Sequence, residues 1–343
     1  MKKVMTLKDI AINSGFSIKT VSRALNNQPG VNKKTKEKII KIAKKYSYYP
    51  NLLAKGLKQK KTFSIGYILT DISNEFYGNI GIAIEKTIKK HEYSLLVVFT
   101  EDDPNTEIEA IKILLNKQID GIILSTCGLT GYFIRDIINN FKIPLVVIDN
   151  KVNGVKTNLV LHNNLKGSYL LTKHLIEHGH KNIACITGSL NRVCGRERLM
   201  GYKKALSEFN IESNSELVKI SNWRIDGGYN ATLQLLKNNP RKVSAIFVAN
   251  SIMALGVYKA IVRSGLKIPD DVAVVAFDEL AFVDFLNPSL TTLNKVDVKI
   301  GELASNMLLR KIENKNDENI ETKIIDMKLC IRESCGCNKS VSI

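Results

Sequence analysis

Short apolar segments alternate with amphipathic ones along most of the chain, from Phe63 onward. The apolar segments have the length of strands, and the amphipathic ones repeat their apolar residues at helical spacing. This alternation predicts an α/β fold, with parallel sheets that carry helices on both faces. Two similar halves follow one another, so we expect two lobes with a cleft between them. The expected strands are Ser64–Thr70, Ser94–Thr100, Asp120–Ser125, Pro144–Asp149, Asn158–Asn163, Asn182–Gly188, Glu216–Asn222, Ala245–Asn250 and Val272–Asp278, and the expected helices include Phe76–His91, Asn164–His178, Gly195–Phe209, Asp226–Asn238 and Ser251–Ser264.

The segment Thr6–Asn26 predicts two short helices joined at a glycine. Thr6 can cap the first helix together with Asp9 three residues later, and Gly15 supplies the left-handed backbone that the turn requires. Ser17 can cap the second helix. This order of residues is typical of a helix-turn-helix, whose second helix enters the major groove of DNA. An amphipathic helical hairpin at the edge of a domain is the alternative.

A third helix is expected over Asn32–Lys45, which completes an all-α headpiece within residues 1–50. Pro50 ends this part of the chain, and residues 51–61 then have the pattern of a hinge. The apolar segment Leu52–Leu57 is too short for a helix that is stable alone, so we expect it to fold on contact with a partner. A flexible linker is the alternative.

Positive charge is concentrated at the N-terminal end. The chain has 50 Lys and Arg against 33 Asp and Glu, a net charge of +17. Residues 1–61 hold 16 of these basic residues and only two acids, so they contribute +14 of the net charge. A module that contacts phosphates, joined to a nearly neutral body, has this distribution. A general excess of lysine would not confine the charge to one end.

Several classes of protein are disfavoured. The first expected strand leads into GYILTDISNEFYG, which has polar residues where a dinucleotide site requires glycines. We find no Walker loop, nucleophile–base pair or metal set, so we expect neither an enzyme nor a cofactor. No apolar run reaches membrane-spanning length, and no signal-peptide pattern precedes the first helix. We therefore expect a cytoplasmic, nucleoid-associated protein without a membrane partner.

The six cysteines do not predict a disulfide framework or a metal site. Cys330, Cys335 and Cys337 lie close together in CIRESCGC, but a zinc site normally has a C-x-x-C pair and a fourth ligand, and this segment has neither. His174 and His178 are four residues apart on an expected helix. They lack the acid of an H-E-x-x-H motif, which favours a solvated helix end. No metal is expected.

The N-terminal segment resembles the LacI (lactose-repressor) family of bacterial transcription regulators, through TLKDIA, SGFS and TVSRALN in this order. FVANSIMALGVYKA, IPDDVAVVAFDEL, NPSLTTL and LCIRES also have the order and spacing of the family, so the resemblance extends from Thr6 to about Ser334. It implies a two-lobed, periplasmic-binding-protein-like core over residues 62–338. No leucine heptad follows Ser334, so a tetramerisation tail is not expected.

In that fold the chain passes between the lobes three times. The resemblance therefore implies that the last strand, near Ile324–Ile331, returns to the second lobe. We expect lobe 1 over about 62–161 and 292–320, and lobe 2 over about 162–291 and 321–338.

The resemblance also implies which residues bind DNA. Ile18, Lys19 and Arg23 would face base edges, and Arg23 paired to guanine would give about 1–3 kcal/mol of discrimination. The leucine at position 57 would insert between bases in the minor groove as a wedge. Polar residues near the helix ends are better placed for phosphates. The expected DNA-binding residues are Thr6, Ser17, Ile18, Lys19, Thr20, Ser22, Arg23, Asn26, Leu57 and Lys58.

Polar and aromatic residues follow the expected strands, at the edge where parallel sheets bind ligands. Carboxylate, guanidinium and amide groups can hold sugar hydroxyls, and the single tryptophan, Trp223, can stack on a sugar face. By resemblance, Arg198 and Asp278 match effector-binding positions of the family. Arg192 matches a ligand contact of the purine-responsive branch, so a nucleobase remains open. The expected effector-binding residues are Asp71, Asn74, Phe76, Asp149, Arg192, Arg198, Trp223, Asn250 and Asp278.

The sequence therefore predicts a homodimeric repressor that binds a palindromic operator in double-stranded DNA and is switched by a small ligand, most simply a sugar. The chain departs from the family at His162 and Ser251, where many members have aspartates, so hydroxyl contacts at those points are in doubt. The alternatives are a purine-responsive or phosphocarrier-coregulated member and, in another class, a sugar-binding transport receptor. A transport receptor would have no use for the basic headpiece.

Overall fold

The structure, a computed structural model, describes residues 5–48, 61–152, 154–237, 243–294, 296–314 and 317–337. The chain forms two units, Met1–Thr62 and Phe63–Ile343. None of the described helices has the length and apolar character needed to cross a membrane.

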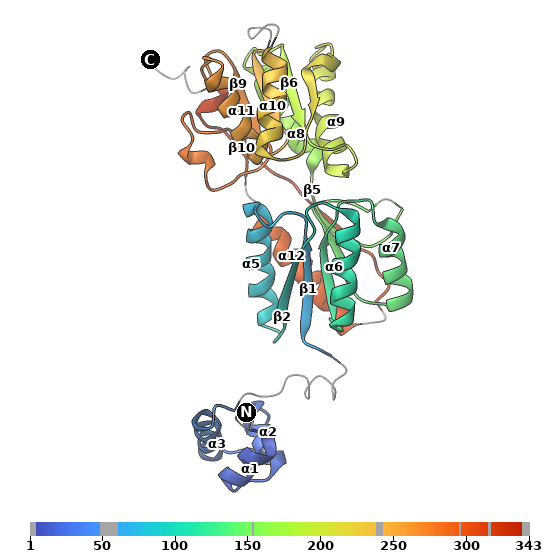
Figure 1. Ribbon diagram of the computed structural model, residues 1–343, viewed down its shortest axis with the longest axis vertical. Helices are drawn as coiled ribbons and strands as arrows, with labels where there is room; N and C mark the ends of the chain where they lie inside the picture. Colours follow the sequence, from blue (N-terminus) through green and yellow to red (C-terminus); the bar gives the residue numbers. More distant parts are fainter. Residues whose placement is uncertain are drawn as a thin grey trace. The chain divides into compact units, whose positions relative to one another are not determined.

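The N-terminal unit contains the three expected helices, α1 (Leu7–Ser14), α2 (Ile18–Leu25) and α3 (Lys33–Lys45) (Figure 1). Their shared core consists of Ile10, Ala11, Val21, Ala24 and Ile39. The two caps and the glycine turn predicted from the sequence are present, since Thr6 and Asp9 form a capping box, Ser17 caps α2 and Gly15 has φ 74°. Of the expected hinge, only residue 61 is described, so Leu57 and Lys58 lie outside the described residues.

One sheet of the second unit has six parallel strands in the order β11-β5-β4-β3-β1-β2. Its helices α5 and α12 pack on one face through an isoleucine- and leucine-rich core, whereas α6 and α7 pack on the other. We call this part lobe 1. Its elements are β1 (Ser64–Leu69), α5 (Glu75–Lys89), β2 (Ser94–Phe99), α6 (Pro104–Asn116), β3 (Gly121–Ser125), α7 (Gly131–Asp136) with the π-helical turn η1 (Ile137–Phe141), β4 (Leu145–Ile148), β5 (Asn158–His162), α12 (Asp297–Glu313) and β11 (Thr322–Ile325).

Lobe 2 is built on a four-stranded parallel sheet in the order β7-β6-β8-β9. Helices α8 and α9 cover one face, and α10 and α11 cover the other (Figure 1). The expected two-lobed α/β architecture is therefore confirmed. The elements of lobe 2 are α8 (Asn164–Glu177), β6 (Ile183–Thr187), α9 (Val193–Glu208), η2 (Ser215–Leu217), β7 (Val218–Ile220), α10 (Ile225–Leu236), β8 (Ala245–Val248), α11 (Ser251–Arg263), β9 (Ala273–Ala276) and η4 (Val283–Phe285).

The prediction that the last strand, near Ile324–Ile331, returns to lobe 2 is correct for β12 (Leu329–Cys330) and wrong for the residues before it. The segment forms two strands, and β11 lies in lobe 1, where it pairs in parallel with β5. The physical reason is that β5 would otherwise be the edge strand of the sheet, with unpaired backbone groups. Pairing with β11 satisfies them, since the Leu159 N–H donates to the Glu321 carbonyl and the Asn163 N–H donates to the Ile325 carbonyl. Residues 321–325 therefore belong to lobe 1.

The chain enters lobe 2 only after β11. There β12 (Leu329–Cys330) pairs antiparallel with β10 (Thr292–Leu293), and Thr291 bridges to Val275 of β9. Residues 292 and 293 therefore belong to lobe 2, whereas the sequence analysis placed them in lobe 1. The turn η5 (Glu333–Cys335) follows and packs beside β9.

Candidate functional site

The exposed face of α2 carries the residues expected to read DNA. Val21 and Ala24 are buried in the headpiece core, which leaves Ile18 and Lys19 exposed and Arg23 half-buried on the opposite side. Ile18 is unusual, since an apolar side chain 48% exposed on a recognition helix is available for apolar contact with a thymine methyl group.

Polar groups cluster at the two ends of α2. The Thr20 N–H donates to Ser17 Oγ at 3.1 Å, so Ser17 caps the helix. At the other end the Asn26 amide donates to the Ser22 carbonyl at 2.9 Å. Thr6 caps α1. The polar residues expected at phosphates thus lie at helix ends; their contact with DNA stays a prediction.

The second unit has a cavity of about 90 Å³ between its lobes, and it brings together all nine residues expected to bind an effector. They come from loops after the strands and from the first turns of helices. Their burial and polarity fit a small polar ligand. The sequence analysis did not find the other polar lining residues, which are Thr70, Ser73, Tyr77, Glu101, Asp102, Asn222 and Arg224.

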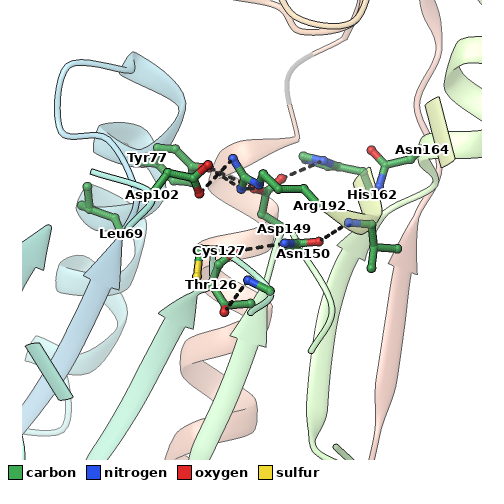
Figure 2. Close-up of polar contacts among 12 residues, drawn as sticks. Leu69, Tyr77, Asp102, Thr126, Cys127, Asp149, Asn150, His162, Asn164 and Arg192 are labelled. Carbon is green, nitrogen blue, oxygen red and sulfur yellow. Dashed lines mark hydrogen bonds and ion pairs between the residues drawn. The ribbon is translucent and has the colours of Figure 1, made fainter. Parts of the chain in front are cut away.

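Arg192 joins the two lobes (Figure 2). From the start of α9 in lobe 2, its guanidinium lies 3.1 Å from Asp149 Oδ2 and 3.8 Å from Asp102 Oδ1, both in lobe 1. The Tyr77 hydroxyl donates to the same Asp149 oxygen at 2.9 Å and accepts from Arg192 at 3.3 Å. Because Arg192 is only 7% exposed, this ion pair between the lobes is shielded from solvent.

A second interlobe contact lies beside the first. Asn150, at the end of β4, accepts a hydrogen bond of 3.0 Å from the Val193 N–H and donates one of 3.0 Å to the Thr126 carbonyl (Figure 2). The first turn of α9 has free N–H groups, so it suits a side-chain oxygen from lobe 1. Lys151 also pairs with Glu197 of α9 at 2.8 Å.

Arg198 is the most deeply fixed cation of the cavity. It is 4% exposed, donates to Asn164 Oδ1 at 2.9 Å and to the Ala249 carbonyl, and lies 3.6 Å above the ring of Phe277. Its NH1 is 3.7 Å from Asp278 Oδ1. Burial raises the pKa of Asp278 to about 6, although Arg198 opposes the shift. Arg198 is thus positioned by neutral acceptors and leaves the Asp278 carboxylate able to accept further donors.

Four residues of the cavity have positive φ, namely Glu101 (52°), Asp102 (62°), Asp149 (64°) and Trp223 (66°). For a bulky side chain this backbone is rare, and such outliers cluster at ligand sites. The indole of Trp223 lies against Gly188, where a Cβ would come within 1.9 Å of the ring, and its Nε1 is buried without a hydrogen-bond partner.

His162 takes no direct part in the cavity. Its ring lies between Phe76 and Phe277, with centroids 5.2 and 6.2 Å away, and its Nδ1 is 3.8 Å from Asp149 Oδ1. Burial lowers the pKa of His162 to about 4, so the ring is neutral at physiological pH. The chain thus has a neutral ring where many family members have a carboxylate.

The fold and this cavity define a two-lobed ligand-binding core attached to a helix-turn-helix. Residues 62–333 match the profile of the periplasmic binding proteins and sugar binding domain of the LacI family, and residues 6–51 match that of the bacterial regulatory proteins of the lacI family. The chain belongs to the LacI family.

Individual relatives agree with this assignment. The ribose operon repressor of Haemophilus influenzae is 34% identical over 96% of this chain and 98% of its own. The transcriptional repressor PurR of Mannheimia succiniciproducens is also 34% identical over the same shares. A crystal structure of the lac repressor dimer bound to operator and the anti-inducer ONPF matches with a TM-score of 0.86 and 26% identity, over 97% of this chain and 99% of that one. The chain is a DNA-binding repressor with an effector-binding core, and not an enzyme.

Proposed function

We propose that this repressor is a homodimer controlled by a small sugar bound in the cavity between its lobes. The supporting observation is the lining of that cavity. Asp278 and Asn250 offer acceptors for hydroxyl groups, Arg198 offers fixed donors, and Trp223 offers an apolar face beside an unpaired N–H. A purine effector is the second candidate, because relatives named for ribose and for purines are equally similar.

The cavity favours the sugar. Its lining includes the carboxylates of Asp71, Glu101, Asp102, Asp149 and Asp278, which accept hydrogen bonds from hydroxyl groups. The guanidinium of Arg192, which matches a ligand contact of the purine-responsive branch, is already paired with Asp149 and Asp102. A nucleobase would have to compete with a buried ion pair for this group. Trp223 and Arg198 likewise support a small-molecule effector over a phosphocarrier alone.

The same contacts suggest how a ligand changes DNA binding. Arg192 and Asn150 connect α9 to the end of β4, so a ligand that contacts Asp149 alters the interactions between the lobes. A ligand shifts such an equilibrium only by its difference in affinity for the two lobe arrangements. In our proposal this shift reaches the dimer and changes how Ile18, Lys19 and Arg23 engage an operator in the cytoplasm, with Leu57 and Lys58 in the minor groove.

Fluorescence of the single tryptophan tests the effector. Trp223 lines the cavity, so ligand binding is expected to change its emission directly. Purified protein is titrated with D-ribose, a hexose, hypoxanthine and guanine, and its gel shift on a duplex selected from a random library is measured with each. We expect a saturable change and an altered operator affinity with a sugar. A response to purines alone would overturn the sugar assignment, and no response to either would overturn small-ligand control.

The affinity for a sugar is expected to fall in acid. The pKa of Asp278 is raised to about 6 by burial, so the group is ionised at pH 7.5 and largely protonated at pH 5. If hydroxyls donate to the charged form, affinity drops about tenfold over this interval, because one proton must be removed on binding. In the Asp278→Asn variant the affinity should be low at both pH values. An unchanged pH profile in that variant would contradict the role of Asp278.

A further inference from the structure

The C-terminal turn η5 brings two thiols against a histidine of α8. His174 is 4% exposed, and its Nε2 lies 3.1 Å from Cys337 Sγ. Cys335 is 1% exposed, and the three ligand atoms of His174, Cys335 and Cys337 lie within 4.8 Å of one another. The expectation that His174 lies on a solvated helix end is therefore wrong, because the segment with Cys335 and Cys337 covers it.

The backbone around this group is held firmly by lobe 2. Ser334 is fully buried; its hydroxyl donates to the Val274 carbonyl at 2.6 Å and accepts from the Thr291 N–H at 2.8 Å. Gly336 then has φ 79°, which turns the chain so that Cys337 lies against α8. This anchoring keeps both thiols near the imidazole at little entropic cost.

We propose that His174, Cys335 and Cys337 bind a zinc ion. Two thiolates and an imidazole are the donors that Zn²⁺ takes, with Zn–S about 2.3 Å and Zn–N about 2.0–2.1 Å, whereas Mg²⁺ and Ca²⁺ require oxygen. Tetrahedral zinc places such atoms about 3.5–3.8 Å apart. The observed spacing needs only small side-chain rotations to reach this geometry.

The site leaves one coordination position open. Within the described part of the chain, no fourth histidine, cysteine or carboxylate joins the group. Water or an exchangeable ligand completes the tetrahedron, as in other sites with three protein ligands. The bound ion links the segment after η5 to α8, so zinc occupancy stabilises lobe 2. The site does not line the cavity between the lobes.

Metal titration of the full chain tests the site. Tag-free protein is stripped with chelator under a phosphine reductant and titrated with Co²⁺. We expect one ion per chain, with thiolate-to-cobalt charge-transfer bands, tetrahedral d–d bands and loss of both on addition of Zn²⁺. Zinc should also raise the thermal midpoint. Absence of these bands in the reduced protein would overturn the site.

Matched variants locate the ion. Cys337→Ser and His174→Gln each remove one ligand and should weaken zinc binding by more than the ~10–100-fold that loss of an outer-shell partner costs. Cys330→Ser removes a thiol of the same C-terminal segment outside the group and should bind zinc as the parent does. Unaltered Trp223 emission shows that each variant is folded. Equal zinc affinity in Cys337→Ser and Cys330→Ser would refute the proposal.

Discussion

Replacing Arg198 by lysine is expected to weaken effector binding by at least about 2 kcal/mol, or roughly 30-fold, because buried charge contacts of this kind carry 2–5 kcal/mol. Lysine keeps the charge but loses the planar fork that bonds Asn164 and the Ala249 carbonyl, and it loses the stacking over Phe277. The substitution lowers ligand affinity because these contacts fix the position of the guanidinium at the cavity. The measurement is a Trp223 fluorescence titration with the sugar that binds the parent protein.

Lysine is preferable to alanine at this position. Arg198→Ala would leave the Asp278 carboxylate buried without its cation, and breaking a buried pair in this way destabilises a protein by about 3–5 kcal/mol. Arg196→Lys is the matched control. It lies on the same helix, but it bonds the backbone carbonyls of Leu190 and Asn191 and does not line the cavity. Equal sugar affinity in Arg198→Lys and Arg196→Lys would show that Arg198 does not hold the effector.

The local parts of the molecule could be predicted from the sequence. The capping box of Thr6 and the turn at Gly15 depend on residues a few positions apart, so the pattern determines them directly. The nine cavity residues were predictable for a different reason: the carboxyl ends of parallel strands meet at one edge, so position along a strand gives position in space.

Contacts between distant segments could not be predicted in this way. The ion pair of Arg192 with Asp149 depends on how the two lobes close, which no local period encodes. The pairing of β11 with β5 likewise depends on which sheet edge is open, since the segment reads as one apolar strand in either lobe. The partner of Cys337 lies 163 residues away on α8, so counting ligands within the C-terminal segment missed His174.

Replacing Arg23 by alanine is expected to reduce operator preference strongly while leaving DNA binding itself. Arg23 lies on the face of α2 opposite the buried Val21 and Ala24, and its guanidinium lies 3.3 Å from where Gly30 would carry a Cβ. A glycine at this point leaves room for the Arg23 guanidinium beside the turn. A bidentate pair with guanine gives about 1–3 kcal/mol of discrimination, or roughly 5–150-fold.

The experiment compares binding to the selected operator and to a scrambled duplex over a series of salt concentrations. In Arg23→Ala the ratio of the two affinities should fall toward one, yet binding should keep its steep salt dependence, because the lysine-rich headpiece still neutralises phosphates. Lys41→Ala, which removes one exposed charge from α3, should weaken both duplexes alike and preserve the ratio. If Arg23→Ala preserves the ratio as Lys41→Ala does, Arg23 does not read the operator. Arg23→Lys separates the two effects further, because it restores the charge without the bidentate geometry and should regain affinity but little of the preference.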